Sequence, residues 1–247
     1  MNVQERLELA ADVFLASTDT TYDECAKGVF TLDRIIIATP SMLVPDVRGY
    51  FVPILYAYWE RFFRISFGEF LRSITLSKFH VDEFKPQIAV LRIGRELADI
   101  SDRHKFKQIQ ELCCNRSVTE IKRLLRQLLT TIESPIEFSP LHQWVRTNSN
   151  VEYTTLEANC IRFGIDVETL KANFVVKPLY ASLKNLVDMR NDIAHGSEFK
   201  TLTAIEWDET RNFVLKIMQV VQVELYESLK DRSKMLGSVT SENDFAI

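Results

Sequence analysis

The sequence predicts an all-α fold, and three observations support that class. Only seven glycines occur in 247 residues, well below the roughly 7% that is usual in soluble proteins. Folds built of strands and tight turns need glycine, whereas long helices exclude it. Apolar residues recur with the helical period along most of the chain, and strand-like alternation never extends beyond a few residues. The most strand-like segment, Arg-Ile-Ile-Ile-Ala at 34–38, is short enough to be buried helix.

Hydrophobic periodicity places the helices at roughly 3–16, 22–39, 50–77, 83–112, 117–132, 153–163, 178–195 and 206–232. Prolines and a glycine mark several of the helix ends. Pro40 and Pro45 are expected to end the second helix, and the stretch 135–140, which begins and ends with proline, is expected to end another. Gly196 follows the helix that carries His195, at the position where a left-handed residue closes many helices.

These elements are expected to form one domain that spans residues 1–247. The predicted core covers about 50–232, the helices at 1–40 are accessory, and the polar, serine-containing tail at 237–247 is expected to be flexible. No glycine-rich phosphate loop, low-complexity linker or fixed-period repeat interrupts this domain.

The charge balance argues against a protein that coats nucleic acid. The net charge is −4, whereas non-specific duplex binders neutralise many phosphates with Lys and Arg. A small cationic site that contacts one or two phosphates remains compatible with this composition. The basic segment Lys-Arg-Leu-Leu-Arg at 122–126 is interpreted as a solvated helix face, with steering of RNA as the alternative.

Cysteine usage gives no sign of a metal site or of disulfides. The four cysteines are Cys25, Cys113, Cys114 and Cys160. No pair has CxxC spacing, and none lies near a histidine at zinc-ligand spacing. We therefore expect reduced core thiols, no metal and no cofactor.

The sequence also predicts a cytoplasmic protein that makes no contact with a membrane. Its first residues, Met-Asn-Val-Gln-Glu-Arg-Leu-Glu, carry charge where a signal peptide would be apolar. No apolar run approaches the about 18 residues that a membrane-spanning helix needs.

The segment at 54–67 predicts a central helix that other helices cover. Apolar side chains lie around nearly its whole circumference, yet Glu60 stands in its middle. Burying a bare carboxylate is costly, so Glu60 is expected to be paired, protonated or used. It could form a helix-surface pair with Arg64, four residues further on, or a buried ion pair with Arg190.

A second helix, which ends at His195, carries the most informative pattern in the chain. Its apolar stripe consists of Leu179, Leu183, Leu186, Val187, Ile193 and Ala194. Arg190 falls at the centre of this stripe, so it faces either the core or another subunit. His195 lies about 140° further round the helix. Asn191 shares a face with His195, and Asp188 and Lys184 lie behind these two residues.

An unbroken helix would not direct Arg190 and His195 at one point. Two arrangements would bring them together: a helix distorted just before Gly196, or two copies of the helix that complete one another's site. The second arrangement is favoured, and it implies a homodimer.

The residue types in this helix suit the cleavage of RNA without a metal. Such cleavage needs a base for the 2′-hydroxyl proton, donors for the charge that develops on the phosphate, and an acid for the leaving 5′-oxygen. Histidine suits the proton steps because its unperturbed pKa is about 6.5. Arginine offers a charged planar fork to the phosphate, and asparagine can donate to a phosphoryl oxygen or fix the imidazole tautomer. Arg190, Asn191 and His195 gather these types within six residues.

A structural interpretation of the same residues stays open. A histidine just before a terminal glycine favours the negative end of a helix, and Arg190 could form a purely structural ion pair with Glu60. The other histidines, His80, His104 and His142, lack partners at metal or triad spacing and are interpreted as surface or structural residues.

Three segments resemble the HEPN superfamily. The segment 190–196, Arg-Asn-Asp-Ile-Ala-His-Gly, resembles its Rx4–6H signature, in which a polar residue often follows the arginine. The segment 53–64, Pro-Ile-Leu-Tyr-Ala-Tyr-Trp-Glu-Arg-Phe-Phe-Arg, resembles the "LYAhWEGfvK" helix of the RiboL-PSP-HEPN branch, which is common in bacterial toxin–antitoxin and anti-phage loci. A softer match, from 147–150 to 160–166, is similar to that branch's "sN…l…lGi" connector. The resemblance covers roughly 52–229.

This resemblance implies a HEPN-type helical bundle with additional helices, and a dimer in which two RxxxxH segments face each other. It implies a metal-independent endoribonuclease that leaves a 2′,3′-cyclic phosphate and acts in toxin–antitoxin or anti-phage systems, with RNA as substrate and an antitoxin protein as partner. The expected catalytic residues, which match the family's arginine, polar follower, histidine and helix glutamate, are Arg190, Asn191, His195 and Glu60.

The sequence departs from the branch at Tyr58 and Arg61, where His and Gly are usual, and the bulkier Arg61 is expected to alter how that helix packs. A non-catalytic HEPN module that binds nucleotide, RNA or a protein partner is the alternative function. A third interpretation, a purely structural helical adaptor, predicts no RNA binding.

Overall fold

The computed structural model describes residues 2–80, 150–195 and 201–236, together with 83–84, 88, 135–138, 145 and 147. Within these ranges the regular secondary structure is helical, apart from two isolated β-bridges. The predicted all-α class is therefore confirmed. None of the helices in this part of the chain combines the length and the hydropathy that crossing a bilayer requires.

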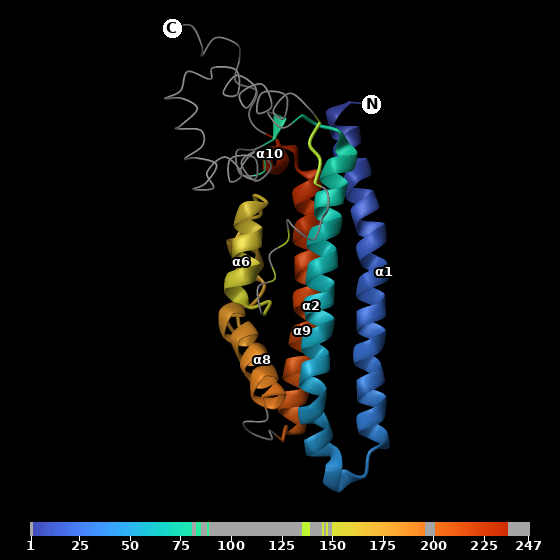
Figure 1. Ribbon diagram of the computed structural model, residues 1–247, viewed down its shortest axis with the longest axis vertical. Coiled ribbons are helices and arrows are strands. Elements are labelled where there is room, and N and C mark those ends of the chain that lie inside the picture. Colours follow the sequence, from blue (N-terminus) through green and yellow to red (C-terminus); the bar gives the residue numbers. More distant parts are fainter. Residues whose placement is uncertain are drawn as a thin grey trace, which may run out of the picture.

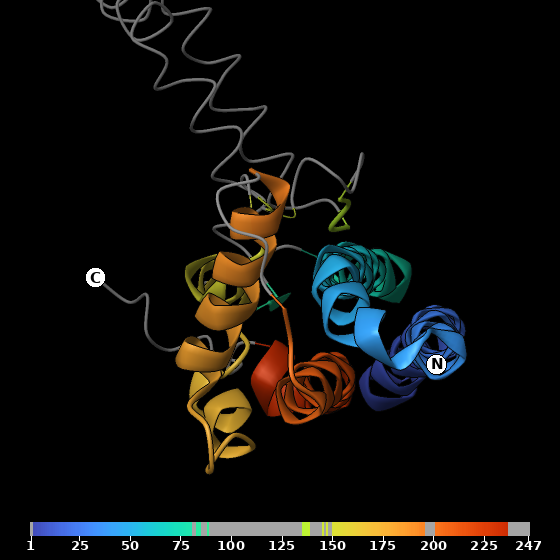
Figure 2. The ribbon, with the colours of Figure 1, turned by 90° about the horizontal axis from the view of Figure 1, so that it is seen from below.

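The architecture consists of a bundle of long helices with shorter helices packed on one side (Figure 1). The elements are α1 (Val3–Ala38), the 3-10 turn η1 (Ser41–Leu43), α2 (Val44–Ser77), α6 (Tyr153–Arg162), α7 (Val167–Ala172), α8 (Leu179–Ala194), α9 (Ala204–Lys230) and α10 (Arg232–Met235). Helices α1, α2 and α9 pack against one another, and α8 packs against α2 on the side away from α1 (Figure 2). Helix α2 thus lies between α1 and the helix that ends at His195.

Helix α1 is continuous where the sequence predicted two helices with a break at 17–21. That stretch, Ser-Thr-Asp-Thr-Thr, has low helix propensity. The Thr18 hydroxyl donates to the Phe14 carbonyl (2.9 Å), and the Gln222 amide of α9 donates to the same hydroxyl (3.0 Å). Packing against α9 therefore stabilises helix across a segment whose local preference is weak.

The connection between α1 and α2 corrects a second prediction. Pro40 follows the end of α1, as expected, but Pro45 lies in the first turn of α2 and begins that helix instead of ending the previous one. Proline is well tolerated there because the first amides of a helix have no intrahelical partner. Helix α2 consequently starts six residues before the predicted start at 50.

The other helix predictions that fall on described residues are confirmed to within two residues. Helices α6, α8 and α9 correspond to the predicted 153–163, 178–195 and 206–232. The start of α9 is fixed by a capping box, in which Thr203 and Glu206 bond to each other's backbone amides. The six-residue α7 was not predicted, because it is too short to show a period. The predicted helices at 83–112 and 117–132 lie almost wholly, and Gly196 and the tail at 237–247 wholly, outside the described residues.

The core is built around aromatic side chains of α2. Those that are fully buried are Tyr56, Trp59, Phe62, Phe63, Phe67 and Phe70. Phe14 of α1 contacts Phe70 edge to face, with ring centroids 6.5 Å apart, and Phe163 stacks on Phe70 at 6.1 Å. Helix α1 therefore shares one hydrophobic core with α2 and with the segment that follows α6.

One edge of α2 stays exposed, contrary to the prediction that other helices cover it. Between 50 and 67 the exposed residues of α2 are Tyr50, Ile54, Ala57, Arg61 and Arg64. The two residues that depart from the family pattern both meet α1. Arg61 forms an ion pair with Glu24 (2.5 Å), and the Tyr58 ring lies so close to Gly28 that a Cβ there would come within 2.3 Å of it.

Candidate active site

Helix α8 carries three of the four predicted site residues. Its buried residues, Leu179, Leu183, Leu186, Val187 and Met189, fix it in the core. Ile193, predicted to belong to this stripe, is half-buried, and Ala194 is exposed. The apolar stripe thus fades towards the C-terminal end of α8. That end is where Arg190, Asn191 and His195 lie.

Arg190 is half-buried between α8 and α2. Its Nη1 donates to the Asn191 Oδ1 (2.8 Å), and its Cζ lies 5.3 Å from the centroid of the Tyr56 ring. A cation over an aromatic face at this distance is an attractive contact. The guanidinium is therefore held by a neutral amide and a ring.

Tyr56 is the residue of this site to which sequence reasoning assigned no role. Its ring is buried, and its hydroxyl accepts a hydrogen bond from the Val151 amide (2.6 Å). Burial raises the pKa of Tyr56, and the negative charge of Glu60 raises it further, while the Val151 amide and the positive charge of Arg190 act in the opposite direction. The phenol is thus protonated at neutral pH. The signal in the sequence is that Tyr56 precedes Glu60 by four residues and so shares its helix face.

Glu60 pairs with its own helix. Its carboxylate lies 3.3 Å from Arg64 Nη2, and its side chain is 25% exposed. Among the described residues no ion pair joins Glu60 to Arg190, so the alternative of a buried Glu60–Arg190 pair is wrong and the helix pair is confirmed. Glu60 and Arg190 nevertheless both act on the Tyr56 phenol, and their charges shift its pKa in opposite directions.

His195 caps the C-terminal end of α8 and is exposed. Helix α8 stays α-helical to Ala194, and the His195 amide donates to the Asn191 carbonyl (2.9 Å). The helix distortion that would have brought Arg190 and His195 together in one chain is therefore not what the structure contains. The two side chains leave α8 about 140° apart.

The exposed face of α8 matches the sequence prediction. Lys184, Asp188, Asn191 and His195 follow one another at helical spacing, and Lys184 Nζ lies 2.5 Å from an Asp188 carboxylate oxygen. Asn191 thus connects two faces of the helix, because its side chain accepts from Arg190 and its position is on the face of His195.

Of the remaining candidate residues, those that the structure describes lie apart from this site. His80 is exposed beyond the far end of α2, and His104, His142 and the basic segment at 122–126 lie outside the described residues. Cys25 and Cys160 are buried and unpaired, as predicted, while Cys113 and Cys114 fall outside the described ranges. In the part of the chain that the structure describes, no three His, Cys, Asp or Glu side chains gather as a metal-binding group would.

Comparison with known families identifies the chain. The family model for RiboL-PSP-HEPN matches residues 32–227, which include both the Tyr56–Glu60 turn of α2 and the whole of α8. Neither a curated protein nor a solved structure matches the chain significantly. HEPN domains are helical bundles generally associated with ribonuclease activity, and some members are non-catalytic. The chain belongs to the RiboL-PSP-HEPN family.

Proposed function

We propose that this protein is an endoribonuclease that cleaves RNA without a metal ion. In this reaction the 2′-hydroxyl oxygen attacks the adjacent phosphorus, the bond from phosphorus to the 5′-oxygen breaks, and a 2′,3′-cyclic phosphate remains. His195 transfers the proton, Arg190 binds the phosphate, and Asn191 orients the two.

The state of Arg190 is the observation that carries this proposal. Arg61, Arg64, Arg72 and Arg211 of the bundle are each paired with a carboxylate. Arg190 has no such partner among the described residues, although it is half-buried. Two other half-buried arginines also lack a carboxylate, but a backbone carbonyl from a distant part of the chain fixes each: Arg6 donates to Ser77, and Arg48 donates to Leu202. Among the described residues Arg190 donates instead to Asn191, its neighbour in the same helix. The positive charge of Arg190 is therefore not neutralised by a carboxylate. Its guanidinium, which lies over the Tyr56 ring and donates to the neutral Asn191 amide, is suited to an anionic ligand such as the RNA phosphate.

We further propose that two copies of the chain complete the site. Arg190 and His195 point in different directions from one regular helix. A two-fold axis beside α8 would place the His195 of one copy opposite the Arg190 of the other, because such an interface presents the same patch from both subunits. In this arrangement Glu60 positions Arg190 indirectly, from the turn of α2 that also carries Tyr56.

The proposed biological role is that of a cytoplasmic growth-inhibiting toxin in a toxin–antitoxin or anti-phage system, with a protein antitoxin as partner. Expression of the wild-type chain should therefore stop cell growth, and expression of His195→Ala at the same level should not. His80→Ala is a matched control, since this histidine is also exposed but lies far from α8 in the sequence and beyond the other end of α2.

The activity is tested by incubating the purified full chain with labelled single-stranded RNA in excess EDTA. Cleavage that EDTA leaves unchanged and that His195→Ala lowers by about 10² to 10⁴ supports the proposal. Binding of the RNA without any cleavage favours the non-catalytic HEPN module. The absence of both binding and cleavage favours a structural adaptor.

A further inference from the structure

A small pocket lies beside the exposed face of α8, about two turns from Asn191. Its volume is about 150 Å³, and it is formed by the start of α6 and the outer side of α8. The residues that matter for its chemistry are Tyr153, Tyr180, Lys184, Glu152 and Asp188. None of these residues was assigned to the cleavage site above.

The pocket and the cleavage site share one stripe of α8. Tyr180, Lys184, Asp188, Asn191 and His195 lie within an arc of about 80° on the helix. Lys184 and Asn191 are separated by seven residues, about 10 Å along the axis. A short stretch of single-stranded RNA can bridge that separation, so a strand whose phosphate lies at Asn191 passes the pocket with a neighbouring nucleotide.

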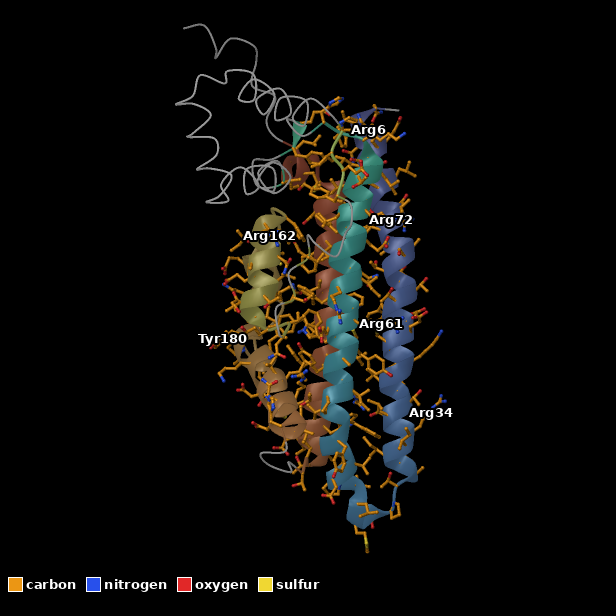
Figure 3. All side chains as sticks on the ribbon, in the orientation of Figure 1. Arg6, Arg34, Arg61, Arg72, Arg162 and Tyr180 are labelled. Carbon is orange, nitrogen blue, oxygen red and sulfur yellow. The ribbon has the colours of Figure 1, made fainter. Side chains whose placement is uncertain are left out.

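An exposed aromatic ring forms one wall of the pocket. Tyr180 is 53% exposed and projects from the outer edge of α8, near the start of α6 (Figure 3). It contacts Tyr153 edge to face, with centroids 5.6 Å apart and planes at 83°. Tyr153 is itself fixed, because its hydroxyl donates to Glu157 (2.7 Å). The contact with Tyr153 thereby holds the Tyr180 ring in one orientation, while much of the Tyr180 side chain remains accessible to solvent. Stacking of a base on the ring requires both properties.

The polar groups of the pocket favour a ligand with hydrogen-bond donors. Glu152 and Asp188 offer carboxylate oxygens, which only accept hydrogen bonds. Lys184 donates to Asp188 and stays charged, since that bond raises the pKa of Lys184. Two carboxylates and one ammonium leave the pocket with an excess of negative charge, which disfavours a phosphate and favours the donor edge of a nucleobase.

We propose that this pocket binds a guanine of the RNA substrate, next to the nucleotide whose phosphate is cleaved. Guanine is the base with two adjacent donors on one edge, the ring N1–H and the exocyclic amino group, and a carboxylate accepts such a pair. Tyr180 stacks on the base, and Glu152 accepts from its edge. The inference rests on the proposed function for the identity of the ligand as RNA.

The test measures binding in the absence of cleavage. Full-length His195→Ala is titrated with fluorescent octauridylate and with the same oligomer carrying one central guanosine, adenosine or cytidine. The guanosine oligomer should bind most tightly. Adding Tyr180→Ala should weaken its binding about 5- to 150-fold, the range measured for loss of a stacked base, and Tyr180→Phe should restore it because the ring remains.

A second variant separates base recognition from packing. Glu152→Gln replaces one acceptor oxygen by a donor, so it should reduce the preference for guanosine over the other oligomers without unfolding the chain. Glu8→Gln is the matched control, since Glu8 is also exposed and loses the same charge, yet lies on α1, which contributes no residue to the pocket.

The outcomes distinguish this inference from the proposed function. If the wild-type chain cleaves RNA, but the oligomers bind equally or Tyr180→Ala leaves binding unchanged, the guanine pocket is wrong and the nuclease stands. If guanosine is preferred through Tyr180 and the wild-type chain never cleaves RNA, the pocket stands and the nuclease is wrong. If no oligomer binds, the pocket is wrong as well.

Discussion

The guanidinium of Arg190 lies over the ring of Tyr56, with Cζ 5.3 Å from the ring centroid. This contact joins the C-terminal half of α8 to α2. The Tyr56 hydroxyl in turn accepts from the Val151 amide, and the Trp59 indole donates to the Val151 carbonyl (3.0 Å). One turn of α2 thus fixes both the segment that leads into α6 and the arginine of α8.

Substitutions of Tyr56 should separate its two contacts. Tyr56→Phe keeps the ring under Arg190 but leaves the buried Val151 amide without its acceptor, so the free energy of unfolding should fall by about 1–3 kcal/mol. Tyr56→Leu loses the ring as well and should lower RNA cleavage by about a further tenfold through misplacement of Arg190. Chemical denaturation and cleavage rates measure the two effects. Equal cleavage by both variants would show that the ring does not position Arg190.

RNA binding should be weakened less by loss of the Asn191 amide than by its replacement with a carboxylate. Asn191→Ala frees the guanidinium of Arg190, whereas Asn191→Asp would pair with it and repel the RNA phosphate. We expect Asn191→Asp to weaken RNA binding by at least about fivefold more than Asn191→Ala, which corresponds to one charge interaction of about 1 kcal/mol. Binding of labelled RNA to the two variants measures this. The reverse order would contradict the proposed phosphate site.

The site could be predicted from the sequence only where regular helix geometry decides. The shared face of Asn191 and His195 follows from their spacing, and α8 shows it. The contact of Arg190 with Tyr56 depends on how α8 is set along α2, and no local pattern encodes that register. For the same reason the sequence left Arg190 and Arg64 as alternative partners of Glu60, whereas the structure pairs Glu60 with Arg64.

The fold, like the site, could be predicted from the sequence only where a regular helical pattern decides. The helical period predicted α6, α8 and α9 because each has a strong apolar stripe. The continuity of α1 could not be predicted, because the residue that supports Thr18 is Gln222, which is 204 positions away. Pro45 was assigned to the wrong helix because proline is common both just after a helix and in the first turn of the next.

Glu60→Gln should have a moderate effect on activity and little on stability. Its pair with Arg64 is partly exposed, and such pairs contribute below about 1 kcal/mol. If Glu60 acts on the site through the field at Tyr56, cleavage should fall while the melting temperature stays nearly constant. Arg64→Gln is the control, because it breaks the same pair and keeps the Glu60 carboxylate. Equal cleavage by the two variants would mean that Glu60 acts only through its ion pair with Arg64.

The buried thiol of Cys160 should make stability depend on alkaline pH. Burial raises the pKa of Cys160, and Glu224 and Glu157 add to the shift. An unfolded thiol ionises at about pH 8.5. Above that pH the unfolded chain releases a proton that the folded chain keeps, so the free energy of unfolding falls as pH rises, by up to about 1.4 kcal/mol per pH unit for one thiol.

Denaturation between pH 8 and 10 measures this dependence. Cys160→Ala should make the free energy of unfolding fall less steeply with pH. The slope that remains comes from the other titrating groups. Leu156→Ala removes a neighbouring buried side chain without a thiol, and it should lower stability at every pH with the slope unchanged. A slope that Cys160→Ala does not alter would mean that this thiol ionises as readily in the folded chain.

Mixing two inactive variants tests the shared site most directly. Arg190→Ala and His195→Ala chains are each purified, combined in equal amounts under conditions that allow subunit exchange, and assayed for RNA cleavage in EDTA. If one copy supplies Arg190 and the other His195, half of the dimers are mixed and each keeps one intact site, so roughly a quarter of wild-type activity should return. Activity no greater than that of the separate variants, beside an active wild-type chain, would contradict a site built from two copies.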